Sequence, residues 1–233
     1  MENNIKKVTD ISNIKIIDND NKEQINNENI DLSFKIIIVG ESSTGKTSLT
    51  NKAINDYFSK SHQVTLGFEY HMMLFEILNN KLKLNIWDTC GQEIYRSLIT
   101  TFYNNSALAV IVFAINDLSS FENVEYWISE VKKNSFPGIR LFLVGNKSDL
   151  ENERTVNKEI IDALILKYNI DYYIETSAKD GNKVIDLFKE IALFLYDDYI
   201  NYNEKNYLEN QRKSYYLDRE SVTSKKEKKC FCS

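Results

Sequence analysis

The chain has 233 residues, enough for one well-buried domain with tails but short for two full domains. Its formal net charge of −5 argues against nucleic acid as the main partner. No apolar run reaches the roughly 18 residues that a membrane span requires, and Met1 is followed by neither a secretory signal nor a myristoylation glycine.

The N-terminal region differs in composition from the rest of the chain. Residues 1–33 contain eight asparagines and no sustained hydrophobic period, so we expect a disordered extension. The stretch ISNIKII within it could instead pair with another segment. Order is expected from Phe34, and the polar stretch over residues 200–233 indicates a flexible tail. The sequence therefore predicts one folded domain over residues 34–199.

The first predicted strand, FKIIIVG, is followed by the spacing GxxxxGK[ST] over residues 40–47 and by a helical pattern from Lys46. In such a loop, backbone N–H groups converge on phosphate oxygens, and the helix N-terminus adds partial positive charge. Lys46 would reach the β- and γ-phosphates, and the Thr47 hydroxyl would ligate Mg²⁺. The candidate phosphate-binding residues are Gly40, Ser42, Ser43, Thr44, Gly45, Lys46, Thr47 and Ser48. A chance glycine turn is the alternative, and the motif alone could also serve an ATPase or a kinase.

A predicted hairpin comes next. EYHMMLFEIL leads through Asn79-Asn80 into KLKLNIW, whose leucines and isoleucine alternate with polar residues. Because asparagine tolerates the positive φ of a tight turn, we expect two antiparallel strands joined at these asparagines.

The second hairpin strand runs into WDTCGQE, which resembles a metal and γ-phosphate sensor. Asp88 is placed to hold Mg²⁺ through water, the Gly91 N–H to bond a γ-phosphate oxygen, and Gln92 to orient the attacking water. Thr65, before the first hairpin strand, could close on both the metal and the γ-phosphate when GTP is bound. Isolated DxxG sequences are common in turns and loop threonines are usually solvated, so these assignments depend on the nearby phosphate loop.

Strands and helices then alternate along the chain. Three apolar runs are predicted to be strands: ALAVIVFAI, IRLFLVGN and DYYIETSA. Between the first two, Ser119 and Glu122 are predicted to form a capping pair that opens a helix to about Asn134. Apolar residues from Val184 are predicted to form one face of a final helix. This order predicts a three-layer α/β domain with a mostly parallel sheet and one antiparallel edge pair.

Two short motifs after successive strands indicate a base-reading pocket. GNKSDL offers Asn146, Lys147 and Asp149, and the Asp149 carboxylate can accept the N1–H and N2 amino hydrogens of guanine, a donor pair that adenine lacks. Lys147 would lay its aliphatic stem along the base. ETSAK adds three further candidates: the backbone N–H of Ala178 for the guanine O6, Lys179 for the other face of the ring, and Ser177.

With these motifs in chain order, residues 34–199 resemble the Rab family of the Ras superfamily, as do LGFEY, KLNIW, IYRSLI and FYNNSA. The resemblance implies a P-loop GTPase fold with a six-stranded sheet and about five helices, and switch regions near residues 58–69 and 88–102. It implies that Phe58 packs edgewise on guanine and that Tyr70, Trp87 and Phe102 form an exposed effector triad, with core packing of these three aromatic side chains as the alternative.

The resemblance also implies the activity and the partners. The implied activity is that of a monomeric GTP/GDP switch with Mg²⁺ that regulates vesicle trafficking. The implied partners are a GTPase-activating protein, a guanine-nucleotide exchange factor, effectors and a GDI-like prenyl chaperone. The expected location is the cytoplasmic face of intracellular membranes, with a cytosolic pool. Cys90 stands where the family has alanine, as a tolerated small residue or a thiol-sensitive site in the second switch, and Ile94 replaces an arginine.

The expected reaction is hydrolysis of the GTP γ-phosphate by water, with Lys46 and Gln92 as catalytic residues. No arginine lies between Thr47 and Thr65, so intrinsic turnover should be slow. A P-loop kinase or ATPase would leave the base-reading motifs without a purpose, and retention of Gln92 argues against a module that binds nucleotide without hydrolysing it.

The chain ends in KKEKKCFCS. Cys230 and Cys232 are two of only three cysteines, which form no disulfide framework and fit a reducing cytosol. The ending can be read as a C-a-a-X box for farnesylation of Cys230, or, by the resemblance, as a double-cysteine site for two geranylgeranyl groups. The neighbouring lysines would strengthen membrane binding. A solvated tail with incidental cysteines is the alternative.

Overall fold

The computed structural model describes residues 11–17, 30–59, 68–89 and 103–203. The chain divides into two units, residues 1–193 and 194–233, and each is described by itself. The first contains the sheet, its covering helices and the site discussed below. Residues 194–203 of the second are helical.

A seven-stranded sheet organises the first unit, in the order β1-β3-β4-β2-β5-β6-β7. The strands are β1 (Lys15–Ile17), β2 (Leu32–Val39), β3 (Phe68–Ile77), β4 (Asn80–Thr89), β5 (Leu108–Ala114), β6 (Arg140–Asn146) and β7 (Tyr172–Glu175). In this sheet order, every neighbouring pair in β4-β2-β5-β6-β7 is parallel, whereas β3 pairs antiparallel with β4 and with β1. The predicted α/β class, mostly parallel with an antiparallel edge, is confirmed.

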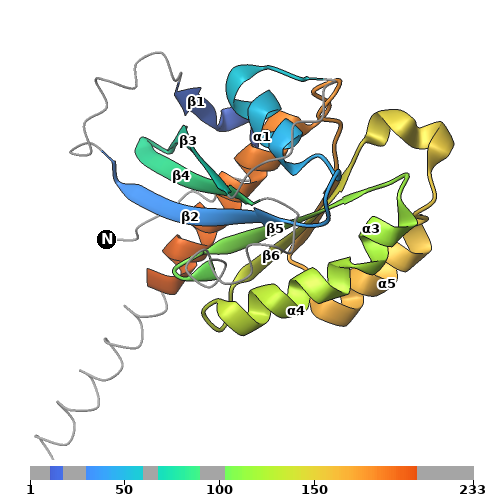
Figure 1. Ribbon diagram of the computed structural model, residues 1–233. Coiled ribbons are helices and arrows are strands. Elements are labelled where there is room, and N and C mark those ends of the chain that lie inside the picture. Colours follow the sequence, from blue (N-terminus) through green and yellow to red (C-terminus); the bar gives the residue numbers. More distant parts are fainter. Residues whose placement is uncertain (1–10, 18–29, 60–67, 90–102, 204–233) are drawn as a thin grey trace, which may run out of the picture. The chain divides into compact units, whose positions relative to one another are not determined.

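Helices cover both faces of this sheet. They are α1 (Lys46–Asn55), α3 (Leu118–Glu122), α4 (Val124–Asn134) and α5 (Lys158–Tyr168), with 3-10 turns η1 (Ile11–Asn13) and η5 (Ser148–Glu153), and the unit ends in helical residues 184–193. Figure 1 shows α3, α4 and α5 together on one side of the sheet and α1 on the other. This is the expected three-layer arrangement.

The segment predicted as one helix from Ser119 is two helices, and its predicted capping pair is wrong. The Asp117 carboxylate accepts from the Ser120 N–H and caps α3, while Asn123 separates α3 from α4. The aspartate two residues before Ser119 satisfies an N–H group at the helix start, so the Ser119–Glu122 pair is not needed.

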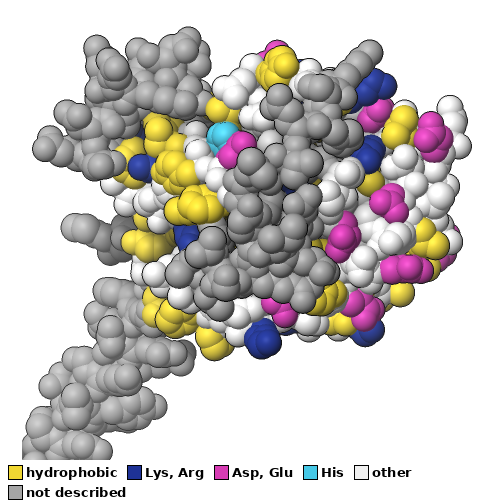
Figure 2. Space-filling view, in the orientation of Figure 1, with side chains coloured by type: hydrophobic (Ala, Val, Ile, Leu, Met, Phe, Trp, Pro, Cys, Tyr) yellow, Lys and Arg dark blue, Asp and Glu magenta, His cyan; other side chains and the backbone are white. Residues whose placement is uncertain are grey.

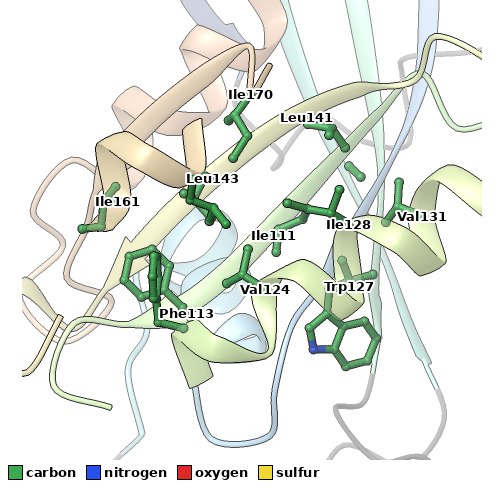
Figure 3. Close-up of a cluster of buried hydrophobic side chains, with 14 of the residues drawn as sticks. Ile111, Phe113, Val124, Trp127, Ile128, Val131, Leu141, Leu143, Ile161 and Ile170 are labelled. Carbon is green, nitrogen blue, oxygen red and sulfur yellow. The ribbon is translucent and has the colours of Figure 1, made fainter. Parts of the chain in front are cut away.

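A cluster of buried side chains lies between the sheet and helices α4 and α5 (Figure 3). All seven residues of β5 are buried, as expected for a central parallel strand covered on both faces. From α4, Val124, Ile128 and Val131 point into the same cluster at helical spacing. This packing fixes the positions of the carboxyl ends of the strands, and therefore of the loops that follow them.

Residues 11–17 were expected to be disordered but form η1 and β1. Lys15 pairs with Glu76 and Ile17 with Leu74 along the outer edge of β3, and Ile14 is buried. Because the edge of a sheet offers unpaired backbone groups, even a short β-branched segment gains hydrogen bonds there. The sheet therefore has seven strands instead of the predicted six. Similarly, β2 begins at Leu32, two residues before the predicted start.

The predicted hairpin is confirmed, with its turn one residue earlier than expected. Leu78 and Asn79 carry the positive φ values of 48° and 66°, and Asn80 already pairs with Ile77. The Asn80 side-chain amide donates to the carbonyl oxygens of Ile77 and Leu78. Asn80 thus stabilises the turn from outside it, which leaves Leu78 in an unusual left-handed conformation.

Candidate nucleotide-binding site

The phosphate loop lies between β2 and α1, at the carboxyl end of the central strands. Gly45 is the N-cap of α1 with φ of 94° and provides no side-chain hydrogen bond to the helix start. The start of α1 therefore has no capping side chain from Gly45, and the N-terminus of a helix is a place where an anion is stabilised. The sequence-predicted loop and helix start are both confirmed in place.

Two glycines of the loop are required by close approach. A Cβ added at Gly40 would lie 2.2 Å from the Val112 carbonyl oxygen, and one added at Gly45 would lie 2.3 Å from Nδ2 of Asn146. Both residues also have φ values in the range that favours glycine. The loop is thus pressed against β5 and against the base-reading motif, and no larger residue fits at either position.

Lys46 is folded back over the loop. The residue is 5% exposed, and its Nζ donates to the carbonyl oxygens of Gly40 and Glu41 at 2.7 Å each. The Thr44 hydroxyl donates to the same Glu41 carbonyl at 2.9 Å. A positive charge is therefore held at the mouth of the loop, where it would neutralise phosphate oxygens.

Asp88 at the end of β4 is fully buried, and both of its carboxylate oxygens lack a hydrogen-bond partner among the described residues. Burial raises the pKa of this carboxyl to about 6, and Glu69 adds to the rise, while the nearby Thr47 hydroxyl and Lys46 charge oppose it. A buried carboxylate without a donor is costly unless a cation compensates it. Asp88 and Thr47 therefore fit a magnesium ion, whose hard oxygen ligands are of this kind.

Asn146 at the end of β6 joins the phosphate loop to the last base-reading loop. Its Nδ2 donates to the Thr44 carbonyl at 2.9 Å, and its Oδ1 accepts from the Thr176 hydroxyl and the Ala178 N–H, each at 3.2 Å. Asn146 is 1% exposed, so this network is buried. Because Ala178 donates to Asn146 here, a guanine O6 would have to share or replace that acceptor, and the predicted contact stays a prediction.

The Asp149 carboxylate lies at the start of η5 and faces the same loop. It accepts from the Ser177 hydroxyl at 2.8 Å and from the Lys179 ammonium at 3.3 Å, with the Asp149 side chain 8% exposed and that of Lys179 51% exposed. Lys147 precedes η5 in the left-handed conformation, with φ of 64°. The structure thus brings Asn146 and Asp149 of the first motif into hydrogen-bond contact with Ser177, Ala178 and Lys179 of the second.

Comparisons with known proteins agree with this geometry. Residues 35–197 match the Ras family. The chain is 35% identical to Ras-related protein Rab-13 of Bos taurus over 159 residues, which are 68% of this chain and 78% of that protein. It is 35% identical to Ras-related protein Rab-19 of Rattus norvegicus over 165 residues (71% and 76%) and 34% identical to Ras-related protein SEC4 of Candida albicans over 173 residues (74% and 82%). The chain belongs to the Ras family.

Within that family it is a Rab-type small GTPase. It binds GTP and GDP with Mg²⁺, hydrolyses GTP, and acts as a switch in vesicle trafficking. Proteins of this type act with activating proteins, exchange factors, effectors and a GDI-type chaperone.

Several predicted residues of this Rab-type GTPase lie outside the described residues. They are Thr65, Cys90, Gly91, Gln92, Ile94, Phe102, Cys230 and Cys232. Their roles stay predictions. Phe58 is described and half-buried, and Ser43 has a positive φ of 62°, whereas Ser42 does not.

Two members of the predicted effector triad of the GTPase are described. Tyr70 on β3 is 48% exposed, and Trp87 lies opposite it on β4, with ring centroids 5.4 Å apart. Phe68 is also exposed and packs on Trp87 at 5.3 Å, and the Lys35 ammonium lies 5.0 Å from the centroid of the Trp87 ring. Figure 2 shows hydrophobic side chains with basic side chains among them on the side of the molecule where β3 and β4 lie. Tyr70 is therefore not packed in the core, which was the alternative for these aromatic residues.

Sequence reasoning missed Arg154 and Tyr173, which donate hydrogen bonds to Glu175 at the start of the last base-reading motif. Arg154, after η5, donates two hydrogen bonds to Glu175 and two to Glu151. Tyr173 donates to Glu175 at 2.7 Å. The signal available was Glu175 itself, the first residue of ETSAK, a carboxylate on a strand that needs a partner. In the described part of the GTPase, no helix combines the length and apolar character needed to cross a bilayer.

Proposed function

We propose that this Rab-type GTPase hydrolyses GTP slowly by itself, and that it acts at the cytoplasmic face of intracellular membranes and exchanges with a cytosolic pool. We also propose that the predicted phosphate and base residues form one guanine-nucleotide site, and the observation that supports this site most directly is the position of Asn146, which bonds both the phosphate loop and the loop that carries Ala178. Guanine and phosphate recognition are then two parts of one pocket. Calorimetry on folded, nucleotide-stripped protein with Mg²⁺ should show tight GDP binding and no competition by ADP. Equal affinity for the two nucleotides would contradict the proposal.

The proposed residue roles combine the contacts of Lys46, Asp149 and Ser177 with roles that the sequence alone predicts, including those of Thr65 and Gln92. Lys46 and the loop N–H groups bind the phosphates, while Asp88, through water, and the hydroxyls of Thr47 and Thr65 hold Mg²⁺. When bound, this ion neutralises charge on the phosphate oxygens. Gln92 orients a water that attacks the γ-phosphorus as the bond to the bridging oxygen breaks, and inorganic phosphate and GDP leave. Asp149 accepts from guanine N1–H and N2, Lys147 and Lys179 cover the ring, and Ser177 orients Asp149.

Slow hydrolysis is proposed because this chain supplies no arginine between Thr47 and Thr65. The charge that develops on the γ-phosphate is then less neutralised than in a protein with an arginine in cis. A single-turnover assay with preloaded GTP measures the rate directly. Acceleration by roughly 10³-fold or more with a cognate activating protein would support the proposal. A fast intrinsic rate would contradict it.

The proposed effector surface is the triad Tyr70, Trp87 and Phe102. Loss of the γ-phosphate would release Thr65 and Gly91 and thereby change the two switch segments beside this surface. Partners captured by the GTP-loaded form and not by the GDP-loaded form should be lost with Tyr70→Ala. Phe136→Ala, which removes an exposed aromatic side chain from the turn after helix α4, is the matched control.

Membrane attachment is proposed to occur through Cys230 and Cys232, in a tail that follows the folded domain proposed for residues 34–199. A single prenyl chain anchors only marginally, so two chains, or one chain with the neighbouring lysines, are needed. Mass spectrometry of Cys230→Ser and Cys232→Ser separates the two lipid schemes, because dual modification leaves one chain on each single variant. Detergent-phase partitioning that survives the double substitution would contradict lipid attachment.

A further inference from the structure

One contact links the phosphate loop to a helix that sequence analysis left out of the site. The indole N–H of Trp127, on α4, donates to Oε1 of Glu41 at 3.2 Å, across 86 positions in sequence. Glu41 is the second residue of the phosphate loop. Trp127 is 9% exposed and belongs to the buried cluster of Figure 3, where it lies beside Val124, Ile128 and Val131 on α4.

Glu41 is also the residue whose carbonyl supports the phosphate-binding lysine. That carbonyl accepts from Nζ of Lys46 at 2.7 Å and from the Thr44 hydroxyl at 2.9 Å. Its side chain therefore points to α4 while its backbone faces the phosphate-binding groups. A Glu41 side chain that is fixed on α4 therefore restrains the backbone whose carbonyl holds Lys46.

Helix α4 is a firm anchor for such a contact. Val124, Ile128 and Val131 have no exposed surface and pack on the sheet beneath the helix. The Trp127 ring is further held edge-on by Tyr126, with centroids 5.4 Å apart. A hydrogen bond from a buried indole to a carboxylate is charge-assisted, and such bonds are stronger than neutral ones.

We propose that Trp127 is a positioning residue for nucleotide binding: through the Glu41 carboxylate it holds the phosphate loop in the conformation in which Lys46 meets the phosphates. Trp127 acts through Glu41 and does not touch the nucleotide. This inference rests on the proposed role of Lys46. It extends the nucleotide site beyond the four sequence motifs to a residue of α4.

The test is the rate of GDP release at fixed Mg²⁺ in a double-mutant cycle. Trp127→Phe keeps an aromatic ring in the core and removes the N–H donor. We expect it to speed GDP release roughly 3- to 10-fold in the wild-type background and to have no effect in the Glu41→Ala background. Tyr126→Phe, on the same helix, is the matched control and should release GDP at the wild-type rate.

A merely structural role for Trp127 predicts something else. Trp127→Phe would then lower the unfolding temperature equally with and without GDP. Its effect on GDP release would be absent, or would be the same in the wild-type and Glu41→Ala backgrounds. Either release result would overturn the proposal. If Trp127→Phe does not fold, Glu41→Gln replaces it. Because Gln retains an oxygen acceptor for the indole, Glu41→Gln should release GDP more slowly than Glu41→Ala, and equal rates would overturn the proposal.

Failure of this inference is distinguishable from failure of the proposed function. If Lys46→Ala weakens GDP binding while Trp127→Phe leaves release unchanged, only the role of Trp127 is wrong. If Lys46→Ala binds GDP as the wild type does, the proposed role of Lys46 itself is wrong.

Discussion

The phosphate loop and the base-reading pocket are built by different means. In the phosphate loop, glycines allow the backbone to pack closely against β5, and the Lys46 ammonium donates to two backbone carbonyl oxygens. In the base-reading pocket, side chains bond to side chains: Ser177 and Lys179 to Asp149, and Thr176 to Asn146. The phosphate loop thus presents backbone groups and is held from outside by Asn146 and Trp127, whereas base recognition depends on side chains of two separate loops being held together.

This difference predicts where each region is most sensitive. A backbone-built loop fails when a side chain is added, because there is no room for it. A pocket built from side chains fails when one of them is removed, because the others lose a partner. The predictions below test this contrast, from the largest expected effect to the smallest.

The largest effect is expected for Gly40→Ala. The new Cβ would lie 2.2 Å from the carbonyl oxygen of Val112, which is backbone and cannot swing aside. We expect the free energy of unfolding to fall by more than ~4 kcal/mol, with loss of GDP binding. Gly138→Ala is the control, since Gly138 has a similarly positive φ of 90° but no atom within 4 Å of the added Cβ, and should cost about 1 kcal/mol. Thermal unfolding and GDP titration measure both, and equal losses would contradict the clash.

Asp149→Asn should weaken GDP binding by roughly 10³-fold, because the amide offers a donor where the carboxylate accepts from the base. Inosine diphosphate, which lacks the 2-amino group, should lose less affinity. The GDP preference over inosine diphosphate should therefore shrink. Asp180→Asn, at an exposed aspartate next to the same loop, is the matched control. If both nucleotides lost affinity equally, Asp149 would not be reading the 2-amino group.

Arg154→Gln should destabilise the base-reading pocket by about 1–3 kcal/mol at pH 7, since Glu175 would keep only the Tyr173 donor. Burial alone would raise the pKa of Glu175, but hydrogen bonds from Arg154 and Tyr173 and the Arg154 charge hold it below its ordinary value of 4.5.

The sign of the pH dependence follows from that lowered pKa. The stabilisation from the Arg154–Glu175 pair is fully present above about pH 4.5 and is lost as the pH falls below it. The difference in unfolding free energy between wild type and Arg154→Gln should therefore shrink on acidification. Arg140→Gln, which removes the more exposed pair with Asp171, should cost less than about 1 kcal/mol. A deficit that grows at low pH would contradict this account of Glu175.

The smallest effect is expected for Ser43→Gly. Ser43 has φ of 62°, which costs a serine more than a glycine, so the substitution should raise the unfolding free energy by up to about 1 kcal/mol. Ser42→Gly, in the same loop but without positive φ, should lower it because glycine gains more freedom on unfolding. Thermal unfolding of both variants with saturating GDP distinguishes them, and stabilisation by Ser42→Gly would contradict the argument from φ.

Much of the site could be predicted from sequence because its motifs are short and local. The spacing from Gly40 to Thr47, with a strand before and a helix after, already implies a backbone cradle with Lys46 above it. Likewise, a mostly parallel sheet brings the carboxyl ends of β2, β4 and β6 to one edge, so Asp88 and Asn146 were expected near the loop.

The N-terminal strand and the hairpin turn could not be placed in this way. Residues 15–17 form a strand because the edge of β3 is available for pairing, and an edge exists only after the hairpin has folded. Leu78 occupies a turn position that its own preference disfavours, because the register of β3 on β4 determines where the chain must reverse.

By itself, therefore, the sequence determined the strands from β2 to β7, the phosphate loop and the candidate base-reading residues, because each depends on neighbours within a few positions. The tertiary structure alone decided that Asn146 bonds Thr44, that Arg154 supports Glu175 and that Trp127 reaches Glu41. These contacts join residues far apart in the chain. No local pattern encodes them, because they form only when packing of the core brings the loops to the same edge of the sheet.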